Sequence, residues 1–139
     1  MKVEYTESSW DEDRWPNFSY AEIADREGNG LWIEELAMDA LQKIRKDLGF
    51  ALNITSAYRS PLHSIEAAKS APGTHTYGVA FDISCRGSFA YRILHAALEI
   101  GFTGIGVKQT GPREGRFLHI DMMNSTLNPD LLRPVVWSY

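Results

Sequence analysis

Two segments of the chain carry apolar residues at the three-and-four spacing of an amphipathic helix. The first follows a glycine-containing break at residues 28–30 and ends at Gly49, and its apolar positions are Ile33, Leu36, Ala37, Ala40, Leu41, Ile44 and Leu48. The second begins with Ser88 as helix N-cap and ends after Ile100, and the side chains expected to face inward are Phe89, Ala90, Ile93, Leu94, Ala97 and Leu98. We expect these two helices to form the scaffold of the fold.

Four other segments have the character of strands. Residues 50–56 alternate between apolar and polar positions, and residues 79–83 form a short apolar run. Residues 103–107 and 117–122 are the other two, and the loop of residues 108–115 between them contains Gly and Pro, which favours a hairpin. This order of elements predicts an α+β fold in which helices flank a small antiparallel or mixed sheet.

Shorter features complete the predicted organisation. Residues 1–16 are polar with scattered aromatics and have no period, so we expect an arm that lies on one domain formed by residues 17–139. Residues 19–22 have the spacing of a capping box, which predicts a short helix. The pair Ser60-Pro61 predicts another helix start, with His63 facing solvent in its first turn.

Composition and charge narrow the class of protein. A length of 139 residues suits one domain, and a hydrophobic content of 44% is enough for a packed core. The formal net charge of −4 argues against nucleic acid or an anionic membrane as partner. The single cysteine, Cys85, excludes an intrachain disulfide and is expected to be a buried, inert thiol. No N-terminal apolar segment has the form of a signal peptide, and we expect a monomer.

Two segments place ionisable side chains among apolar ones. His75 falls in a loop and Asp82 in an apolar strand, where a carboxylate needs a charged, hydrogen-bonded or metal partner. In the last predicted strand, the two-residue period puts His119 and Asp121 on one face. Two imidazoles and one carboxylate at a sheet edge suit a tetrahedral zinc site with one position left for water. A single histidine in an apolar run is more often a hydrogen-bonded core residue, so this hypothesis requires that all three side chains converge.

Three blocks of sequence together resemble one enzyme family. They are Ser56-Ala57-Tyr58-Arg59-Ser60, then His75 with Gly78, Ala80 and Asp82, then Phe117-Leu118-His119-Ile120-Asp121. In this order they resemble the zinc peptidases of the D-Ala-D-Ala carboxypeptidase and L-Ala-D-Glu endopeptidase family, particularly its short phage-type members. The resemblance covers roughly residues 17–139, including the closing Arg133-Pro134-Val135-Val136-Trp137-Ser138-Tyr139. It implies a fold like that of DD-peptidases and hedgehog domains, with Zn²⁺ as cofactor.

The resemblance also implies roles for individual residues. The zinc ligands would be His75, Asp82 and His119. Arg59 would hold the substrate carboxylate or the developing oxyanion, a role suited to a guanidinium fork, and the alternative is a surface salt bridge. Ser56 either hydrogen-bonds the substrate or only ends its strand. Tyr77 is expected at the rim of the pocket, in a packing role.

The general base departs from the best-known family pattern. Many members place a Glu three residues before the last histidine, but Arg116 occupies that position here and cannot accept a proton. Shorter members resemble this chain in having an Asp two residues after that histidine. We therefore expect Asp121 to activate the zinc-bound water, with Glu114 as the second candidate. The alternative for Asp121 is to hold a ligand imidazole through its distal N–H.

The function implied is hydrolysis of peptide bonds in peptidoglycan stem peptides, by D-Ala-D-Ala carboxypeptidase or L-Ala-D-Glu endopeptidase activity. Without a signal peptide, a phage-encoded protein of this kind would stay in the host cytoplasm before its release to the cell wall as a lysis enzyme. The alternatives are a zinc-binding module that has lost catalysis and a phage virion component without activity.

Overall fold

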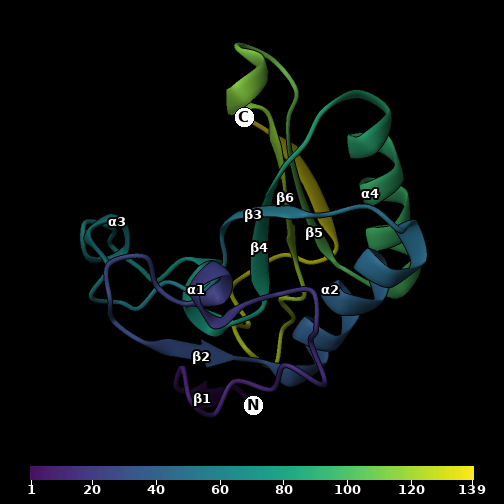
Figure 1. Ribbon diagram of the computed structural model, residues 1–139. Helices are drawn as coiled ribbons and strands as arrows, with labels where there is room; N and C mark the ends of the chain where they lie inside the picture. Colours follow the sequence, from purple (N-terminus) through teal and green to yellow (C-terminus); the bar gives the residue numbers. More distant parts are fainter.

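The structure, a computed structural model, describes residues 1–139 and contains a five-stranded sheet with helices packed against it (Figure 1). The strands are β3 (Asn53–Ser56), β4 (Ala80–Ser84), β5 (Gly104–Lys108), β6 (Phe117–Asp121) and β7 (Val135–Ser138), in the spatial order β3-β4-β6-β5-β7. All neighbours are antiparallel except β5 and β7, which are parallel. The predicted α+β fold with a small mixed sheet is therefore confirmed, including the hairpin of β5 and β6.

The two scaffold helices lie together along one side of this sheet (Figure 1). They are α2 (Glu35–Leu48) and α4 (Gly87–Ile100), and both are predicted from the sequence. Each ends at a glycine in the left-handed conformation, Gly49 with φ of 76° and Gly101 with φ of 107°. Glycine adopts this conformation without the steric cost that a Cβ brings, so these residues end the helices where the sequence indicates.

The predicted start and inner face of α4 need correction. Its N-cap is Arg86, and no side chain caps the helix, so Ser88 lies inside the first turn. The residues it buries are Ala90, Ile93 and Ala97. The larger Phe89 and Leu98 are exposed, because the buried stripe of this helix is narrower than the one predicted and small residues allow close packing.

The first residues of the chain contribute to the core. Strand β1 (Val3–Tyr5) pairs antiparallel with β2 (Leu31–Ile33), so Ile33 belongs to a strand and not to the following helix. Trp10 and Trp15 are both buried in the main hydrophobic cluster. The short helix α1 (Tyr20–Ile23) follows, and its predicted capping box is confirmed. The N-terminal segment thus lies on the domain and also fills part of its interior.

The helix predicted at Ser60 begins later in the chain. Helix α3 (Ser64–Ala67) has His63 as its N-cap, and the His63 Nδ1 accepts a hydrogen bond from the Ile65 amide. His63 is therefore buried and does not face solvent as expected. The Ser60 amide donates to the buried Asp25 carboxylate instead, an interaction between residues far apart in sequence that no local pattern indicates.

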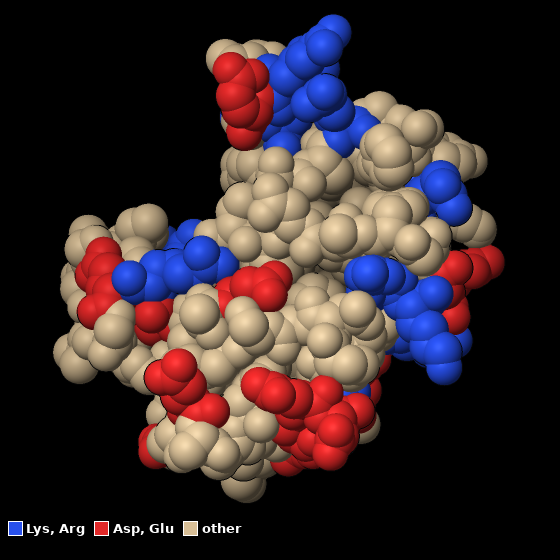
Figure 2. Space-filling model, viewed as in Figure 1, with Lys and Arg blue, Asp and Glu red and all other residues tan.

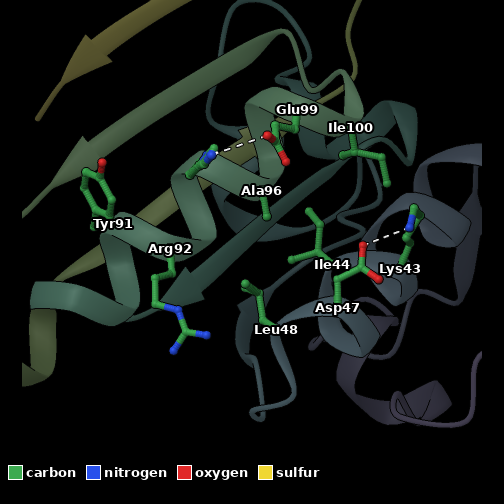
Figure 3. Close-up of a pocket in the computed structure, with 10 residues that line it drawn as sticks. Lys43, Ile44, Asp47, Leu48, Tyr91, Arg92, Ala96, Glu99 and Ile100 are labelled. Carbon is green, nitrogen blue, oxygen red and sulfur yellow. Dashed lines mark hydrogen bonds and ion pairs between the residues drawn. The ribbon is translucent and has the colours of Figure 1, made fainter.

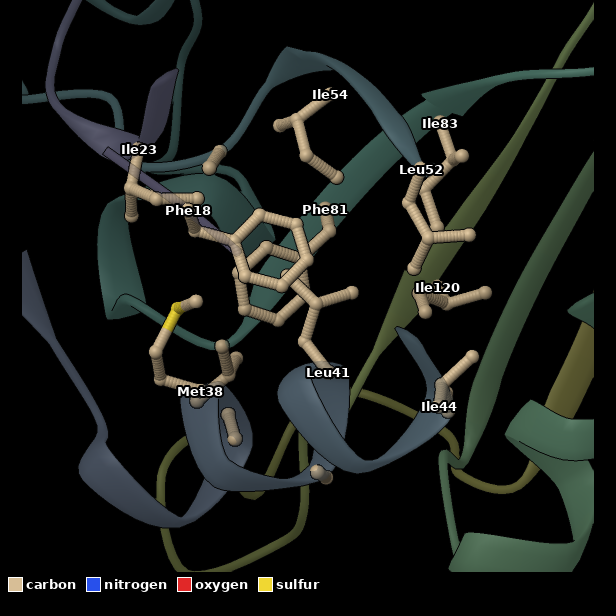
Figure 4. Close-up of a cluster of buried hydrophobic side chains, with 14 of the residues drawn as sticks. Phe18, Ile23, Met38, Leu41, Ile44, Leu52, Ile54, Phe81, Ile83 and Ile120 are labelled. Atoms are coloured by element: carbon tan, nitrogen blue, oxygen red, sulfur yellow. The ribbon is translucent and has the colours of Figure 1, made fainter. Parts of the chain in front are cut away.

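The core lies between the sheet and the helices (Figure 4). Alternate residues of β4, Phe81 and Ile83, point into it together with Ile120 of β6, and they meet Leu41 and Ile44 of α2. Because side chains alternate along a strand, the residues between them point to the opposite face. That face carries the candidate site. None of the helices is long and apolar enough to cross a membrane.

We predict that Trp15→Ala lowers the free energy of unfolding by about 3–5 kcal/mol, because it removes a large, fully buried side chain from the core. The measurement is urea denaturation followed by circular dichroism. Leu36→Ala is the matched control, since Leu36 is 75% exposed on α2 and its truncation should cost less than about 1 kcal/mol. A similarly small cost for Trp15→Ala would mean that the N-terminal segment is not part of the core.

Candidate metal centre

One row of residues crosses the whole sheet on the face away from α2 and α4. The strand register aligns Ser56 with Asp82, Asp82 with His119, His119 with Gly106, and Gly106 with Trp137. Directly paired residues on neighbouring strands share a face, so their side chains can meet. The short 3-10 helix η1 (Thr74–Tyr77) then brings His75 to the same place. One ligand atom each from His75, Asp82 and His119 lie within 4.8 Å of one another.

The orientation of His75 is set by the backbone. Its Nδ1 lies 2.6 Å from the Ala57 carbonyl oxygen, and a carbonyl only accepts, so the Nδ1–H must donate. A neutral His75 therefore presents the Nε2 lone pair, which lies 3.3 Å from the Asp82 Oδ1. The imidazole is buried, which holds this orientation in place.

His119 is oriented by a carboxylate, and it presents its Nδ1 to Asp82, whereas His75 presents its Nε2. Its Nε2 lies 2.8 Å from the Asp121 Oδ2, and its Nδ1 lies 2.9 Å from the Asp82 Oδ1. Burial lowers the pKa of His119, but the hydrogen bonds to Asp121 and Asp82 outweigh it and raise that pKa. When His119 is neutral and donates through Nε2, its Nδ1 lone pair faces Asp82.

These orientations fit a bound cation. Two imidazole lone pairs and one carboxylate oxygen converge, and three acceptors with no donor between them repel unless a proton or a metal ion lies among them. Tetrahedral Zn²⁺ with bonds of about 2.0–2.1 Å separates its ligand atoms by about 3.3–3.5 Å, close to the 2.9 and 3.3 Å found here. Without a metal ion, protonated imidazoles can donate to Asp82 instead: burial raises its pKa, but these hydrogen bonds outweigh burial and hold that pKa well below its usual range. The ligand carboxylate is therefore ionised.

Asp121 has all of its acceptor capacity in use. Its Oδ2 accepts from His119 and from the Arg133 Nη2 at 2.9 Å, and its Oδ1 accepts from the Arg133 Nε at 3.0 Å and from the Met123 amide at 3.1 Å. Burial raises its pKa, but the bonds to His119 and Arg133 outweigh this and lower the pKa to about 2. The residue is fully buried. This geometry disfavours the general-base role expected from the sequence, because no lone pair is free to take a proton from water.

Two glycines make room for this arrangement. A Cβ on Gly104 would fall on the Asp121 carboxylate, and one on Gly106 would lie 2.7 Å from the Trp137 Nε1. Because Gly104 and Gly106 have no side chain, the Asp121 carboxylate and the Trp137 indole can lie close against the backbone of β5. The Trp137 ring then packs against His119 with ring centroids 5.1 Å apart, and the Arg133 guanidinium lies over the same indole. Together these contacts cover one side of the metal centre.

Arg59 lies beside the three ligands and is held by a buried carboxylate. Its Nη2 is 3.8 Å from the Asp82 Oδ2, and its Nη1 donates to the Glu66 Oε2 at 3.2 Å. The Glu66 side chain has no exposed surface and also accepts from Lys69 and from the Gly73 amide. Burial raises the pKa of Glu66, but these bonds outweigh it and lower that pKa. Arg59 is thus an oriented guanidinium at the edge of the ligand set.

The other residues predicted for the site are placed less centrally. Ser56 pairs with Asp82 at the end of β3 and is half-buried. Tyr77 ends η1 and packs against the hydrophobic core. Glu114 lies in the exposed turn η2 (Arg113–Gly115), at the tip of the β5–β6 hairpin, and no hydrogen bond or ion pair joins it to the three ligands. This position does not suit the general-base role considered for Glu114.

Three residues of the site are missed by the sequence reasoning. Glu66 and Arg133 are seven and twelve residues away from the partners they hold, and ordinary surface ion pairs look the same in a sequence. Trp137 falls in β7, which pairs parallel to β5 and has no local turn to indicate it. One signal was available: glycines at 104 and 106 mark alternate positions of a strand, which is typical of a close approach to its backbone.

A groove of about 600 Å³ lies between α2 and α4, away from the metal ligands (Figure 3). Four of its ionisable side chains pair along the helices, Lys43 with Asp47 and His95 with Glu99. Arg92 lies over the Phe50 ring instead, 5.1 Å from its centroid.

The fold brings together three side chains, His75, Asp82 and His119, that could hold a metal ion. A family model described as Peptidase M15 matches residues 16–121, which include His75, Asp82, His119 and Asp121. The match covers most of the chain, and the chain belongs to this peptidase family. A comparison with curated proteins finds no match.

We predict that Gly104→Ala weakens zinc binding about tenfold or more, because the new Cβ displaces the Asp121 carboxylate that orients His119. The affinity is measured by competition with a chromogenic chelator. Gly115→Ala is the matched control, since its Cβ would meet no atom within 4 Å. Equal affinities of the two folded variants would show that the position of Asp121 does not affect the metal.

Proposed function

We propose that the protein is a zinc-dependent peptidase that hydrolyses peptide bonds in peptidoglycan stem peptides. Membership of the Peptidase M15 family supports peptidase activity, and the convergence of His75, Asp82 and His119 supports a metal-dependent one. The observation that carries the proposal is the convergence of the His75 Nε2 and the His119 Nδ1 on the Asp82 Oδ1, at 3.3 and 2.9 Å. A lysis function in a phage remains our expectation from the resemblance.

The residues around the metal centre have different roles at the scissile peptide bond in this proposal. His75, Asp82 and His119 would hold a zinc ion, which would supply a water with a pKa lowered to about 7 and a Lewis acid for the substrate carbonyl group. Arg59 donates N–H groups to the substrate carboxylate or to the developing oxyanion, and Glu66 holds the guanidinium in position for this. A stem peptide offers such carboxylates, which is the chemical reason to expect it as substrate.

Asp121 acts in this proposal as a positioning residue. It holds the His119 Nε2–H, and Arg133 holds Asp121 in turn with two parallel hydrogen bonds. Such a carboxylate fixes the tautomer of the imidazole and strengthens it as a ligand. This is the second of the two roles that the sequence leaves open. In this proposal the proton of the attacking water passes to solvent and solvent supplies one to the leaving amine, so neither Asp121 nor Glu114 is the proton acceptor.

The proposal is tested with purified, zinc-loaded protein and isolated peptidoglycan, with the released products identified by mass spectrometry. Loss of the terminal D-Ala indicates carboxypeptidase activity, and a new D-Glu amino terminus indicates endopeptidase activity. We expect His75→Ala to abolish both metal binding and release of product, since one of the three ligands is lost. A wild-type protein that binds zinc tightly and cleaves neither bond would instead be the non-catalytic zinc-binding module.

We predict that Asp121→Asn lowers activity mainly by weakening zinc binding by about 10–100-fold, so that excess zinc restores most of the rate. Glu114→Gln should leave kcat within about twofold of wild type, because Glu114 contacts none of the ligands. The measurement is kcat as a function of zinc concentration. A general base would behave differently: its loss costs about 10²–10⁴ in rate at full zinc occupancy. That result for either variant would restore the base assignment.

A further inference from the structure

A second cavity, of about 680 Å³, lies at the hairpin end of the sheet, where α4 begins. Three arginines line it: Arg86 precedes α4, Arg113 lies in η2 and Arg116 follows η2. No carboxylate lines this cavity, and none of the three guanidinium groups forms an ion pair. Three segments of the chain therefore bring unneutralised positive charge to one hollow.

The positive charge at this cavity contrasts with the negative net charge of the whole protein. The chain has a net charge of −4, yet Lys and Arg outnumber Asp and Glu by five to two within residues 83–118. Figure 2 shows a group of basic side chains at the upper end of the molecule with one acidic patch beside it, further basic side chains at mid-height, and acidic side chains over much of the lower end. Like charges held close together repel one another, so an anion that enters the cavity relieves that repulsion.

The chemistry of the lining indicates the class of anion. Guanidinium groups form paired, parallel hydrogen bonds with phosphate oxygens, and more than one of them is needed to match a dianion. The first turn of α4 adds amide groups that no side chain caps, with no acidic residue in that turn. The lining also has an apolar part, where Phe50 and Phe89 meet edge to face with ring centroids 5.0 Å apart. The cavity is within the size range of small-ligand sites, about 300–1,000 Å³, and much larger than a bare anion needs.

We propose that this cavity binds a phosphorylated sugar, with the phosphate group among Arg86, Arg113 and Arg116 and the sugar ring against Phe89. Phe89 is 53% exposed at the rim, so a ring can reach it without any rearrangement of the core. The cavity is on the side of the sheet covered by α4, whereas the metal ligands are on the other face. The inference does not depend on the proposed peptidase activity, and binding here would leave the metal centre free.

The test uses zinc-loaded protein labelled with ¹⁵N and titrated separately with glucose 6-phosphate, inorganic phosphate and glucose. We expect glucose 6-phosphate to shift the amide resonances of Gly87 and Ser88 and to bind more weakly as salt is raised. Arg86→Gln and Arg113→Gln should each weaken this binding about tenfold, as expected for loss of one charge-assisted contact. Lys46→Gln is the matched control, since it removes one positive charge from α2 outside the cavity.

Each alternative result overturns a stated part of the proposal. Shifts confined to the surroundings of His75, Asp82 and His119 would mean that the phosphate binds at the metal centre. Arginine variants that bind within twofold of wild type, with spectra of folded protein, would remove the cavity from the site. Equal shifts with glucose would exclude recognition of the phosphate. Equal affinity for inorganic phosphate would exclude the contact of the sugar ring with Phe89 and leave free phosphate as the ligand.

Discussion

The structure depends on one electrostatic constraint: the His75 Nε2, the His119 Nδ1 and the Asp82 carboxylate meet in a nearly buried space. A proton or a cation must lie among these atoms when they are close, so the surrounding protein holds each group in place. The Ala57 carbonyl does so for His75, and the Asp121 carboxylate does so for His119. A cation at this point would be coordinated by all three side chains, which therefore form a candidate metal centre.

The register of the sheet decides whether these side chains can meet. The ligands Asp82 and His119 face each other only because β4 and β6 pair in one particular register, and a shift by one residue would turn both into the core. The apolar residues between them prevent that shift, since Phe81, Ile83 and Ile120 are committed to the opposite face. The hydrophobic core thus fixes the geometry of the polar site. Apolar and polar residues alternate along β4 and β6, so the same pattern determines both the packing of the core and the position of the candidate ligands.

Much of this arrangement could be predicted because it is local or periodic. The two long helices, the capping box of α1, the β5–β6 hairpin and the common face of His119 and Asp121 all follow from spacing along the chain. The pairs that link distant segments could not be predicted in this way. Arg59 finds Glu66 across a loop, and Arg133 finds Asp121 from beyond the hairpin, although neither pair has a distinctive spacing. The role of Asp121 changes accordingly, since its partners decide whether a lone pair is free.

The Arg133 contact has a consequence for the extent of the functional unit. The segment matched by the family ends at residue 121, so it contains every ligand but neither Arg133 nor Trp137. Arg133 supplies two of the four hydrogen bonds that the buried Asp121 carboxylate accepts, and Trp137 packs against one side of His119. The contacts that orient His119 therefore extend through β7, beyond the last residue of the candidate ligand set.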